Sequence, residues 1–470
     1  MKLKTMLMSA LGLAVIACNS DTSISAGQDI FAANKLLAKS INFGNALEAP
    51  TEGAWGMVLE ESFFEAVKQG GFTGIRLPIK FSSHALATAP FTIDKTFMDR
   101  IDWAVNQATS RGLAIIVDMH HYDELMTDPA ANKDRFLGMW QQIAAHYKDA
   151  PNNVFFEIHN EPNGNIEPLW NEYSSAALKV IRESNPTRAV IVGPNGWNSA
   201  WRLPELKLPD DKNLIVTFHN YEPFSFTHQG AEWISPIPPV GVNWPIAGAA
   251  LRAPWQNWSW GTTLEANGNT AFNVTYNQGY AGAYFHRDDG ATGFSSLKIK
   301  TDKPVSLLVT CLEKNVQGVQ NPPGATVQTQ AGVTLEIPLV SCSNPSTVRD
   351  LMIQNNSANA VPTFKLEQLE LVSASKTESL FSNAEETAAS YLEYAAAWGK
   401  KNNRPIFMGE FGAYGKADAA SRVRWTTFMR AESEKREFSW AYWEFGTGFG
   451  VYDRTAKAYR QDLLGALIPK

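Results

Sequence analysis

The chain has few cysteines, no strong excess of charge and no long apolar run beyond its first residues. Only 3 cysteines occur among 470 residues, and no histidines stand at zinc-ligand spacing from them, so the sequence gives no case for a metal site. The formal net charge is -6, and no Lys/Arg-rich run occurs, which argues against a nucleic-acid partner. After residue 18, no stretch is long and apolar enough to span a bilayer.

The first 18 residues are predicted to be an export signal. Two lysines precede a short apolar run that ends in small residues before Cys18. The segment resembles a bacterial lipoprotein signal, in which the cysteine is lipidated and becomes the mature N-terminus. This implies an outer-membrane lipoprotein or an extracellular protein, with membrane contact only through a lipid on Cys18. An ordinary cleaved signal with an incidental cysteine is the alternative. Residues 19–30 are small and polar and are predicted to be a linker.

Eight short apolar runs alternate with helical patterns along most of the chain. Because their apolar content is nearly continuous, they are predicted to be parallel strands buried on both faces. The runs are residues 40–46, 73–79, 113–119, 154–160, 189–193, 214–220, 405–411 and 438–443. Amphipathic helices are predicted at 94–111, 132–149 and 169–185. Alternating β–α units of this kind favour an α/β fold, the (β/α)8 TIM barrel.

One connection, from the sixth strand to the seventh, is too long to be a plain loop in a compact domain. Within it, residues 257–375 show period-2 apolar alternation divided by Gly, Asn and Pro turns, which is typical of an all-β sandwich. We therefore predict a β-sandwich domain inserted after barrel strand 6. The catalytic barrel then comprises residues 31–256 and 376–470.

The predicted insert contains two features with open alternatives. Its aromatic residues either form a carbohydrate-binding platform or fill the sandwich core; they are Trp258, Trp260, Tyr276, Tyr280 and Tyr284. Cys311 and Cys342 either form one disulfide, as an exported chain allows, or remain two buried thiols.

Polar and aromatic residues collect at the C-terminal ends of the predicted barrel strands, where TIM barrels carry their active sites. Strand 2 gives Arg76, strand 3 gives His120 and His121, strand 4 gives Asn160 and Glu161, strand 6 gives His219 and Tyr221, strand 7 gives Glu410, and strand 8 gives Trp443 and Glu444. A zinc site on His120 and His121 is rejected, because adjacent residues of a strand point to opposite faces.

Glu161 and Glu410 lie on strands 4 and 7, which face each other across the ring. Glycoside hydrolysis needs one carboxylic acid to protonate the leaving oxygen and one carboxylate to attack the anomeric carbon. Retaining enzymes hold these carboxyls about 5–5.5 Å apart, which opposite strands allow. The two pKa values should differ, and Arg76 and Tyr221 are candidates to keep Glu410 ionised. Asn160 is a candidate to bind the sugar 2-hydroxyl.

Several segments resemble glycoside hydrolase family 5, near its bacterial endoglucanase branch. They are FGNALEAPTEGAWG (43–56), GIRLPI (74–79), DMHHYDEL (118–125), HNEPNG (159–164), FHNYEPFSFTHQG (218–230) and MGEFGAY (408–414). The resemblance covers 31–256 and 376–470 and leaves the insert unexplained. It implies a retaining enzyme with Glu161 as acid/base and Glu410 as nucleophile, without a cofactor.

The same resemblance implies roles for the residues around the catalytic pair. Arg76, His120, Asn160, His219 and Tyr221 become the supporting polar shell, and Trp443 stacks on the sugar before the cleaved bond. Asn45 and Glu48 become ligands of sugar hydroxyls further along the non-reducing side. His121, His228 and Trp233 match binding positions of the same branch.

The sequence thus predicts a monomeric endo-acting β-1,4-glucanase whose partner is a cellulose-like or mixed-linkage β-glucan, as polysaccharide or oligosaccharide. A β-mannanase and a xyloglucanase are the alternatives within the enzyme class, because the same catalytic set serves several glycans. A surface glycan-binding protein that has lost catalysis is the alternative outside it. That reading is disfavoured because both carboxylates are present.

Overall fold

The computed structural model describes residues 29–313, 323–343 and 345–469. The predicted signal 1–18, with Cys18, and most of the predicted linker 19–30 lie outside the described residues. The end of that linker is helical, because the Asp29 carboxylate accepts a hydrogen bond from Phe31 N and caps α1 (Ile30–Lys35). Among the described residues, no helix has both the length and the apolar character needed to cross a membrane.

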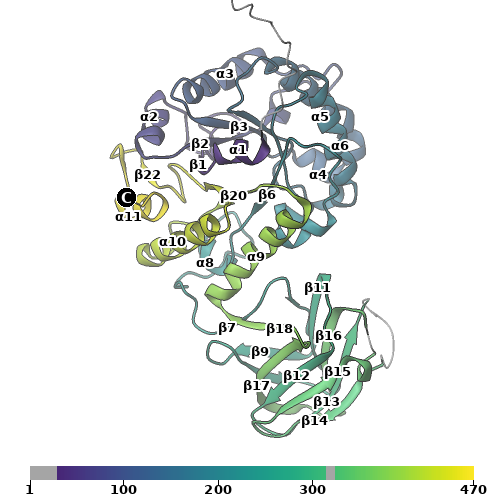
Figure 1. The fold of residues 1–470 in the computed structure, drawn as a ribbon. Helices are drawn as coiled ribbons and strands as arrows, with labels where there is room; N and C mark the ends of the chain where they lie inside the picture. Colours follow the sequence, from purple (N-terminus) through teal and green to yellow (C-terminus); the bar gives the residue numbers. More distant parts are fainter. Residues whose placement is uncertain (1–28, 314–322, 344, 470) are drawn as a thin grey trace, which may run out of the picture.

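Eight parallel strands close into a barrel in the order β1-β2-β3-β4-β5-β6-β20-β21, which confirms the predicted fold (Figure 1). Their bounds are β1 Lys39–Asn42, β2 Gly74–Ile79, β3 Ala114–Met119, β4 Val154–Glu157, β5 Val190–Val192, β6 Leu214–His219, β20 Ile406–Phe411 and β21 Ser439–Tyr442. Every residue of these strands except Lys39 is buried. This explains their nearly continuous apolar runs, since side chains fill the barrel on one face and meet helices on the other.

Helices surround the barrel and follow the predicted patterns closely. They are α2 Glu61–Gln69, α3 Lys95–Thr109, α5 Pro129–His146, α6 Trp170–Ser184, α9 Ala384–Asn402, α10 Ala419–Lys435 and α11 Gln461–Leu467. Helix α5 begins three residues before its predicted start, because Asp128 caps it and Pro129 occupies its first turn. Helix α9 begins with a capping box formed by Asn383 and Glu386.

The inserted domain consists of two antiparallel sheets, ordered β15-β12-β17-β10-β9, with β18 beside β17, and β14-β13-β16-β11-β8. The bounds are β8 Gln256–Asn257, β9 Thr262–Ala266, β10 Phe272–Tyr276, β11 Gly282–Thr292, β12 Ser296–Thr301, β13 Ser306–Leu312, β14 Ala325–Gln328, β15 Thr334–Pro338, β16 Thr347–Asn355, β17 Val361–Val372 and β18 Thr377–Ser379. At its base, β7 (Ala249–Leu251) pairs with β19 (Phe381–Asn383). The β-structure therefore extends beyond the predicted limits of 257–375 on both sides.

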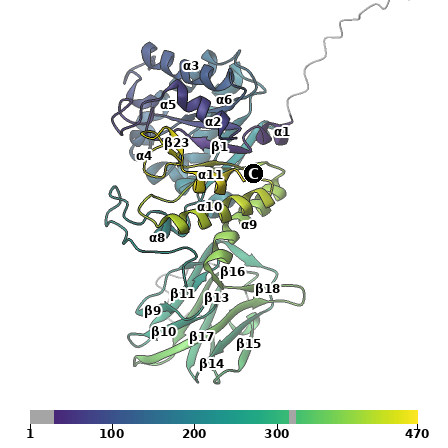
Figure 2. The ribbon, with the colours of Figure 1, turned by 90° about the vertical axis from the view of Figure 1, so that its left-hand side faces the viewer.

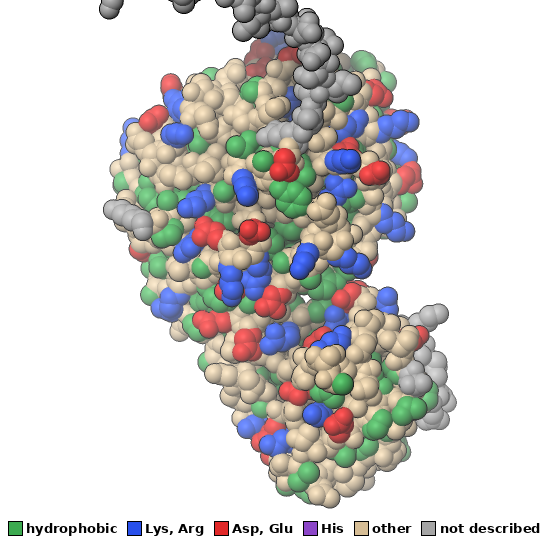
Figure 3. All heavy atoms as spheres, viewed as in Figure 1, with side chains coloured by type: hydrophobic (Ala, Val, Ile, Leu, Met, Phe, Trp, Pro, Cys, Tyr) green, Lys and Arg blue, Asp and Glu red, His purple; other side chains and the backbone are tan. Residues whose placement is uncertain are grey.

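The insert lies beside α9, and its strand β11 lies against the 3-10 helix η3 (Ala200–Glu205) of the barrel (Figure 1). In Figure 2, β9 and β11 lie on the same side of the molecule as α8 (Phe224–Thr227), whereas α1 lies on the opposite side. Because α8 follows β6, this is the side of the C-terminal strand ends. Figure 3 shows acidic and basic side chains interspersed over one face of both domains.

The two cysteines of the insert lie in contact in its core. Cys311 and Cys342 are buried and free, with their Sγ atoms 2.9 Å apart. The backbone N–H of Cys311 also donates to the carbonyl of Cys342 over 3.2 Å. Of the two predicted alternatives, the structure therefore has the two buried free thiols, and their sulfur atoms are in contact.

Candidate active site

The C-terminal ends of the barrel strands open into a cleft of about 1070 Å³. All the predicted site residues except Glu48 and Arg76 line this cleft. The lining residues among them are Asn45, His120, His121, Asn160, Glu161, His219, Tyr221, His228, Trp233, Glu410 and Trp443. The two exceptions lie beneath its surface, and both are completely buried.

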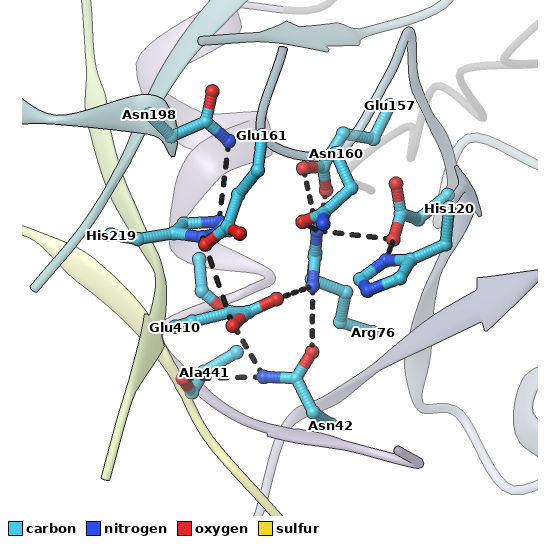
Figure 4. Close-up of polar contacts among 12 residues, drawn as sticks. Asn42, Arg76, His120, Glu157, Asn160, Glu161, Asn198, His219, Glu410 and Ala441 are labelled. Atoms are coloured by element: carbon cyan, nitrogen blue, oxygen red, sulfur yellow. Dashed lines mark hydrogen bonds and ion pairs between the residues drawn. The ribbon is translucent and has the colours of Figure 1, made fainter. Parts of the chain in front are cut away.

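Glu410, at the end of β20, is held by two donors, of which Figure 4 shows Arg76. Its Oε1 accepts a hydrogen bond from Arg76 Nη1 over 2.7 Å, and its Oε2 accepts one from the Tyr221 hydroxyl over 2.7 Å. Burial raises the pKa of this carboxyl, while His219, Arg76 and Tyr221 act in the opposite direction. The preceding residue must be glycine, because a Cβ on Gly409 would lie 2.6 Å from Thr217 Oγ1. These contacts hold the carboxylate in a fixed orientation in the cleft.

Glu161 follows β4 in a left-handed backbone conformation, with φ of 48°, which turns it into the cleft. Its Oε1 lies 2.7 Å from Nδ1 of His219. Burial raises the pKa of Glu161 to about 7, Arg76 opposes the shift, and Glu157 adds to it. A carboxyl that keeps its proton near neutrality can serve as a general acid.

The tautomer of His219 is linked to the proton on Glu161. Burial lowers the pKa of His219 to about 4, so the ring is neutral near pH 7. Nε2 of the ring lies 3.4 Å from the Asn198 amide nitrogen, while Oδ1 of the buried Asn198 has no partner among the described residues. Rotating the side-chain amide of Asn198 by 180° exchanges its nitrogen and oxygen, so that Oδ1 accepts a hydrogen bond from Nε2–H of His219. Nδ1 is then free to accept a hydrogen bond from the protonated carboxyl of Glu161.

The closeness of the two glutamates favours one stereochemical class. One oxygen of Glu161, one oxygen of Glu410 and a ring nitrogen of His219 lie within 4.8 Å of one another. Retaining glycosidases hold their carboxyls about 5–5.5 Å apart, and inverting ones about 6.5–9.5 Å apart. These three side chains also have the composition of a metal site, but the guanidinium of Arg76 already contacts Glu410, and its positive charge disfavours a cation there.

Arg76 is the centre of a buried polar network under the cleft (Figure 4). Its Nε and Nη2 donate to the two oxygens of Glu157 over 2.7 and 2.9 Å, and Nη2 also lies 3.0 Å from Asp118 Oδ2. Nη2 donates to Asn160 Oδ1 over 2.8 Å, and Nη1 donates to Asn42 Oδ1 over 3.0 Å. A buried guanidinium needs such partners, and here they orient it toward Glu410.

Three members of this network, Asn42, Asp118 and Glu157, were not among the predicted site residues; from the sequence, Glu157 was interpreted as a barrel-wall or rim acid. Aligning the neighbouring barrel strands could have indicated these residues, because Asn42 pairs with Arg76 and Asp118 pairs with Glu157. Burial raises the pKa of Asp118 to about 7 and also raises that of Glu157, although Arg76 acts against both shifts. His120 Nδ1 shares Asp118 Oδ2 with Arg76, which fixes the His120 ring at the cleft floor.

Trp443 forms one wall of the cleft beside His120. The two rings are nearly parallel, at 10°, with centroids 5.9 Å apart. The indole lies directly on Gly44, where a Cβ would come within 2.9 Å of the ring. Asn45, the next residue, donates from Nδ2 to Thr447 Oγ1 over 2.6 Å. Strands β1, β3 and β21 thus supply one end of the cleft, with a flat ring exposed to it.

Glu48 differs from its predicted role as a sugar ligand. It is completely buried, and its two oxygens accept the backbone N–H groups of Asn45 and Ala46. Burial raises the pKa of Glu48 to about 8, against the effect of these hydrogen bonds. The neighbouring buried Glu444 binds the backbone N–H groups of the loop that carries Thr447. Glu48 therefore shapes the loop that presents Asn45 and cannot reach a sugar.

The opposite end of the cleft has an aromatic lining that the sequence reasoning did not identify. It includes Trp197 and Trp201, which follow β5, and Tyr391 of α9. Gly196, Trp197 and Asn198 all adopt left-handed conformations, with φ of 63°, 56° and 55°. This unusual turn leaves the Trp197 side chain 58% exposed in the cleft. Backbone strain of this kind is tolerated where function needs it.

A TIM barrel with two facing carboxyls at the ends of β4 and β20 defines a barrel glycoside hydrolase. The description of the matching family is cellulase (glycosyl hydrolase family 5), and the match covers residues 38–279 and 371–448. The chain belongs to this family and is an endoglucanase-like glycoside hydrolase. The interval between the two matched segments falls within the inserted domain.

Among curated proteins, Endoglucanase H of Acetivibrio thermocellus is 42% identical over 202 residues, which are 43% of this chain and 22% of that protein. Endoglucanase 3 of Fibrobacter succinogenes is 30% identical over 219 residues, which are 43% of this chain and 33% of that protein. The chain therefore matches less than two thirds of the length of these relatives.

Among solved structures, endoglucanase Cel5A from Thermotoga maritima is 34% identical with a TM-score of 0.63, over 94% of this chain and 100% of that one. The same Thermotoga maritima protein in complex with mannotriose gives 33% identity and a TM-score of 0.61, with the same coverage. A hyperthermophilic endo-β-1,4-glucanase in complex with substrate gives 32% identity and a TM-score of 0.64, also over 94% and 100% of the two chains.

Proposed function

We propose that this hydrolase cleaves internal β-1,4-glucosidic bonds of cellulose-like or mixed-linkage β-glucan with retention of anomeric configuration. The observation that carries the proposal is the spacing of Glu161 and Glu410, with oxygens within 4.8 Å, in a cleft that is open beyond both glutamates. An open cleft allows a chain to pass through, and it suits cleavage at internal bonds.

The reaction would proceed in two steps. Glu410 attacks the anomeric carbon while Glu161 transfers its proton to the glycosidic oxygen, and the leaving chain departs with that proton. A water molecule then attacks the glycosyl–Glu410 ester as Glu161 takes a proton from it, which restores both carboxyls. Arg76 and Tyr221 hold the Glu410 oxygens through the hydrogen bonds described above. Their donors stabilise the carboxylate as it leaves in the second step.

The test is hydrolysis of carboxymethyl cellulose, barley β-glucan, xyloglucan, glucomannan and galactomannan by the wild type and Glu410→Gln. Release from the two β-glucans that is abolished in Glu410→Gln is the expected result. Glu385→Gln, on the exposed first turn of α9, is a matched control that should keep full activity. Proton NMR of the first product should show the β anomer.

A β-mannanase is the second candidate, because one solved relative of this chain was crystallised with mannotriose. Activity on galactomannan alone would replace the glucan substrate and keep the mechanism. Activity on xyloglucan alone would favour the xyloglucanase alternative. Binding to a glycan without any cleavage would favour the glycan-binding protein.

We also propose that the chain is exported and anchored through Cys18, on the resemblance of its first residues to a lipoprotein signal. Labelling of cells with a radioactive fatty acid should mark the wild type and not Cys18→Ser. Equal labelling of the two chains, or none of the wild type, would contradict the anchor.

A further inference from the structure

The aromatic residues of the insert include buried and exposed members in the structure. Tyr276 is completely buried, and its hydroxyl donates to the carbonyl of Ile353 over 2.7 Å, so it belongs to the core. Trp258 and Trp260, by contrast, are 42% and 40% exposed. Both follow β8 and pair with β11, since Trp258 N donates to Tyr284 O and Trp260 N donates to Gly282 O. We call these two indoles, with Tyr284 and His286 beside them, the insert platform.

The rings of the insert platform are fixed before any ligand arrives. The Trp258 ring stacks on His286 with centroids 3.9 Å apart and planes at 16°. His286 is held in turn by Asp350 over 2.6 Å and by Asp288 over 3.1 Å. Trp260 lies on Gly282, where a Cβ would come within 2.5 Å of the indole. Exposed tryptophans held this rigidly lose little entropy when they bind a ligand.

The chemistry around the platform suits an uncharged glycan. Indole faces match the apolar C–H face of a pyranose ring. Beside the ring, Gln256 Oε1 accepts a hydrogen bond from Trp258 Nε1 over 3.2 Å, and Gln256 Nε2 donates to Asp288 over 3.4 Å. Asp288 and Asp350 are the charged groups that contact His286, and they disfavour an anionic polymer.

The insert that carries the platform adjoins one particular end of the cleft. Glu161, as the acid, must face the leaving-group half of the substrate. Trp197 borders that side, because its N–H donates to the carbonyl of Pro162, next to Glu161. Trp201 of η3 packs against Tyr391, and both line the cleft. Strand β11 lies against η3, so the insert adjoins the leaving-group side, and Figure 2 shows β9 and β11 on the same side of the molecule as α8.

We propose that the inserted domain carries a second glycan-binding site, in which Trp258 and Trp260 stack on the β-glucan chain where it continues beyond the leaving-group end of the cleft. This inference rests on the proposed function for the identity of the glycan. The site increases the affinity for polymers and has no effect on short oligosaccharides, which end inside the cleft.

The test separates binding from catalysis by using Glu410→Gln as the background, so that the polymer stays intact. The retardation of the Glu410→Gln protein in a native gel containing barley β-glucan is compared with that of a triple variant, which carries Trp258→Ala and Trp260→Ala in addition to Glu410→Gln. We expect about tenfold weaker polymer binding from the loss of two stacking rings. Val340→Ala, which changes a residue 68% exposed elsewhere on the insert, is the control and should bind as the background does.

Kinetics with an intact Glu410 supply the second readout. The double tryptophan variant should show a higher KM on polymeric β-glucan, with kcat unchanged, and normal kcat/KM on a cello-oligosaccharide of three or four units. Thermal unfolding checks that the variant is folded; if it is not, the single variants replace it, each with a smaller loss of polymer binding.

Unchanged polymer binding and unchanged polymer KM in the tryptophan variants would overturn the proposed site. An equal loss on polymer and oligosaccharide would also overturn it, because the effect would then come from the cleft. A wild type that binds β-glucan through the platform but hydrolyses none would contradict the proposed function while leaving this site in place.

Discussion

Nδ1 of His219 lies 2.7 Å from Oε1 of Glu161, so the proton of the acid and the tautomer of the imidazole depend on each other. Because His219 also lies 3.7 Å from Oε2 of Glu410, the same ring is placed between the two carboxyls. The donor and acceptor pattern of one buried histidine therefore influences which glutamate carries the proton at neutral pH. Several predictions about activity depend on this relationship.

The first concerns the pH dependence of catalysis. Burial raises the pKa of Glu161 to about 7, and the acid works only while it is protonated, so kcat/KM on β-glucan should fall as the pH rises through about 7. Glu161→Gln should lack this alkaline limb of the pH profile, the fall of kcat/KM above about pH 7, and should lose most of its activity on glucan. It should retain more of its activity on an aryl glycoside, because that leaving group needs no proton. A wild-type profile that stays flat across pH 7 would contradict the assignment.

Asn198 is predicted to act through His219. If its amide oxygen accepts Nε2–H, Asn198→Ala lets the proton move to Nδ1, which then donates to Glu161 and favours the ionised carboxyl. The alkaline limb should therefore shift to lower pH, and activity at neutral pH should fall about tenfold. A pH profile of kcat/KM measures both, beside Asn402→Ala at the exposed end of α9 as control. A fall in activity with an unmoved limb would indicate a structural role only.

Arg76 should be essential for both stability and activity. Arg76→Lys removes the two-pronged contact with Glu157 and leaves buried acids with fewer partners. We expect a loss of about 3 kcal/mol in the free energy of unfolding, in the range for a broken buried ion pair. Urea denaturation measures it. Arg111→Lys, which pairs with exposed glutamates, should change stability by less than about 0.5 kcal/mol.

Glu48 should matter through the loop that it organises. Glu48→Gln replaces one acceptor oxygen by an amide that faces a backbone N–H, so the loop carrying Asn45 should shift. We expect a stability loss of about 1–3 kcal/mol and a raised KM on glucan oligosaccharides. Glu65→Gln, on the exposed face of α2, is the matched control. A raised KM with full stability would instead indicate direct contact with the sugar.

The thiols of the insert are predicted to be readily oxidised to a disulfide, because Cys311 and Cys342 are already in contact. Alkylation under denaturing conditions, before and after mild oxidation, should show both thiols lost together without dimer formation. The bridge should raise the stability of the insert by about 3 kcal/mol, because it closes the loop between Cys311 and Cys342 and so lowers the entropy of the unfolded chain. Two thiols that remain fully reactive after oxidation would contradict this.

The sequence by itself determined the barrel and the positions of the two candidate catalytic glutamates. Strands buried on both faces leave continuous apolar runs, and helices leave a 3.6-residue period, so eight β–α units can be read locally. Once the strands are placed, the TIM barrel puts their C-terminal ends at one mouth, and Glu161 and Glu410 are found without knowledge of side-chain contacts. The presence of the inserted β domain was equally legible from its period-2 pattern.

The tertiary structure alone decided how those residues are supported. Glu48 looks like a sugar ligand in the sequence, but the packing of two loops buries it. Tyr391 enters the cleft from a helix that follows the whole insert, and Tyr276 and Trp258 take opposite environments within one short stretch of β structure. Local patterns fix which segments are strands and helices, whereas burial and hydrogen bonding depend on residues that are distant in the chain and meet only on folding.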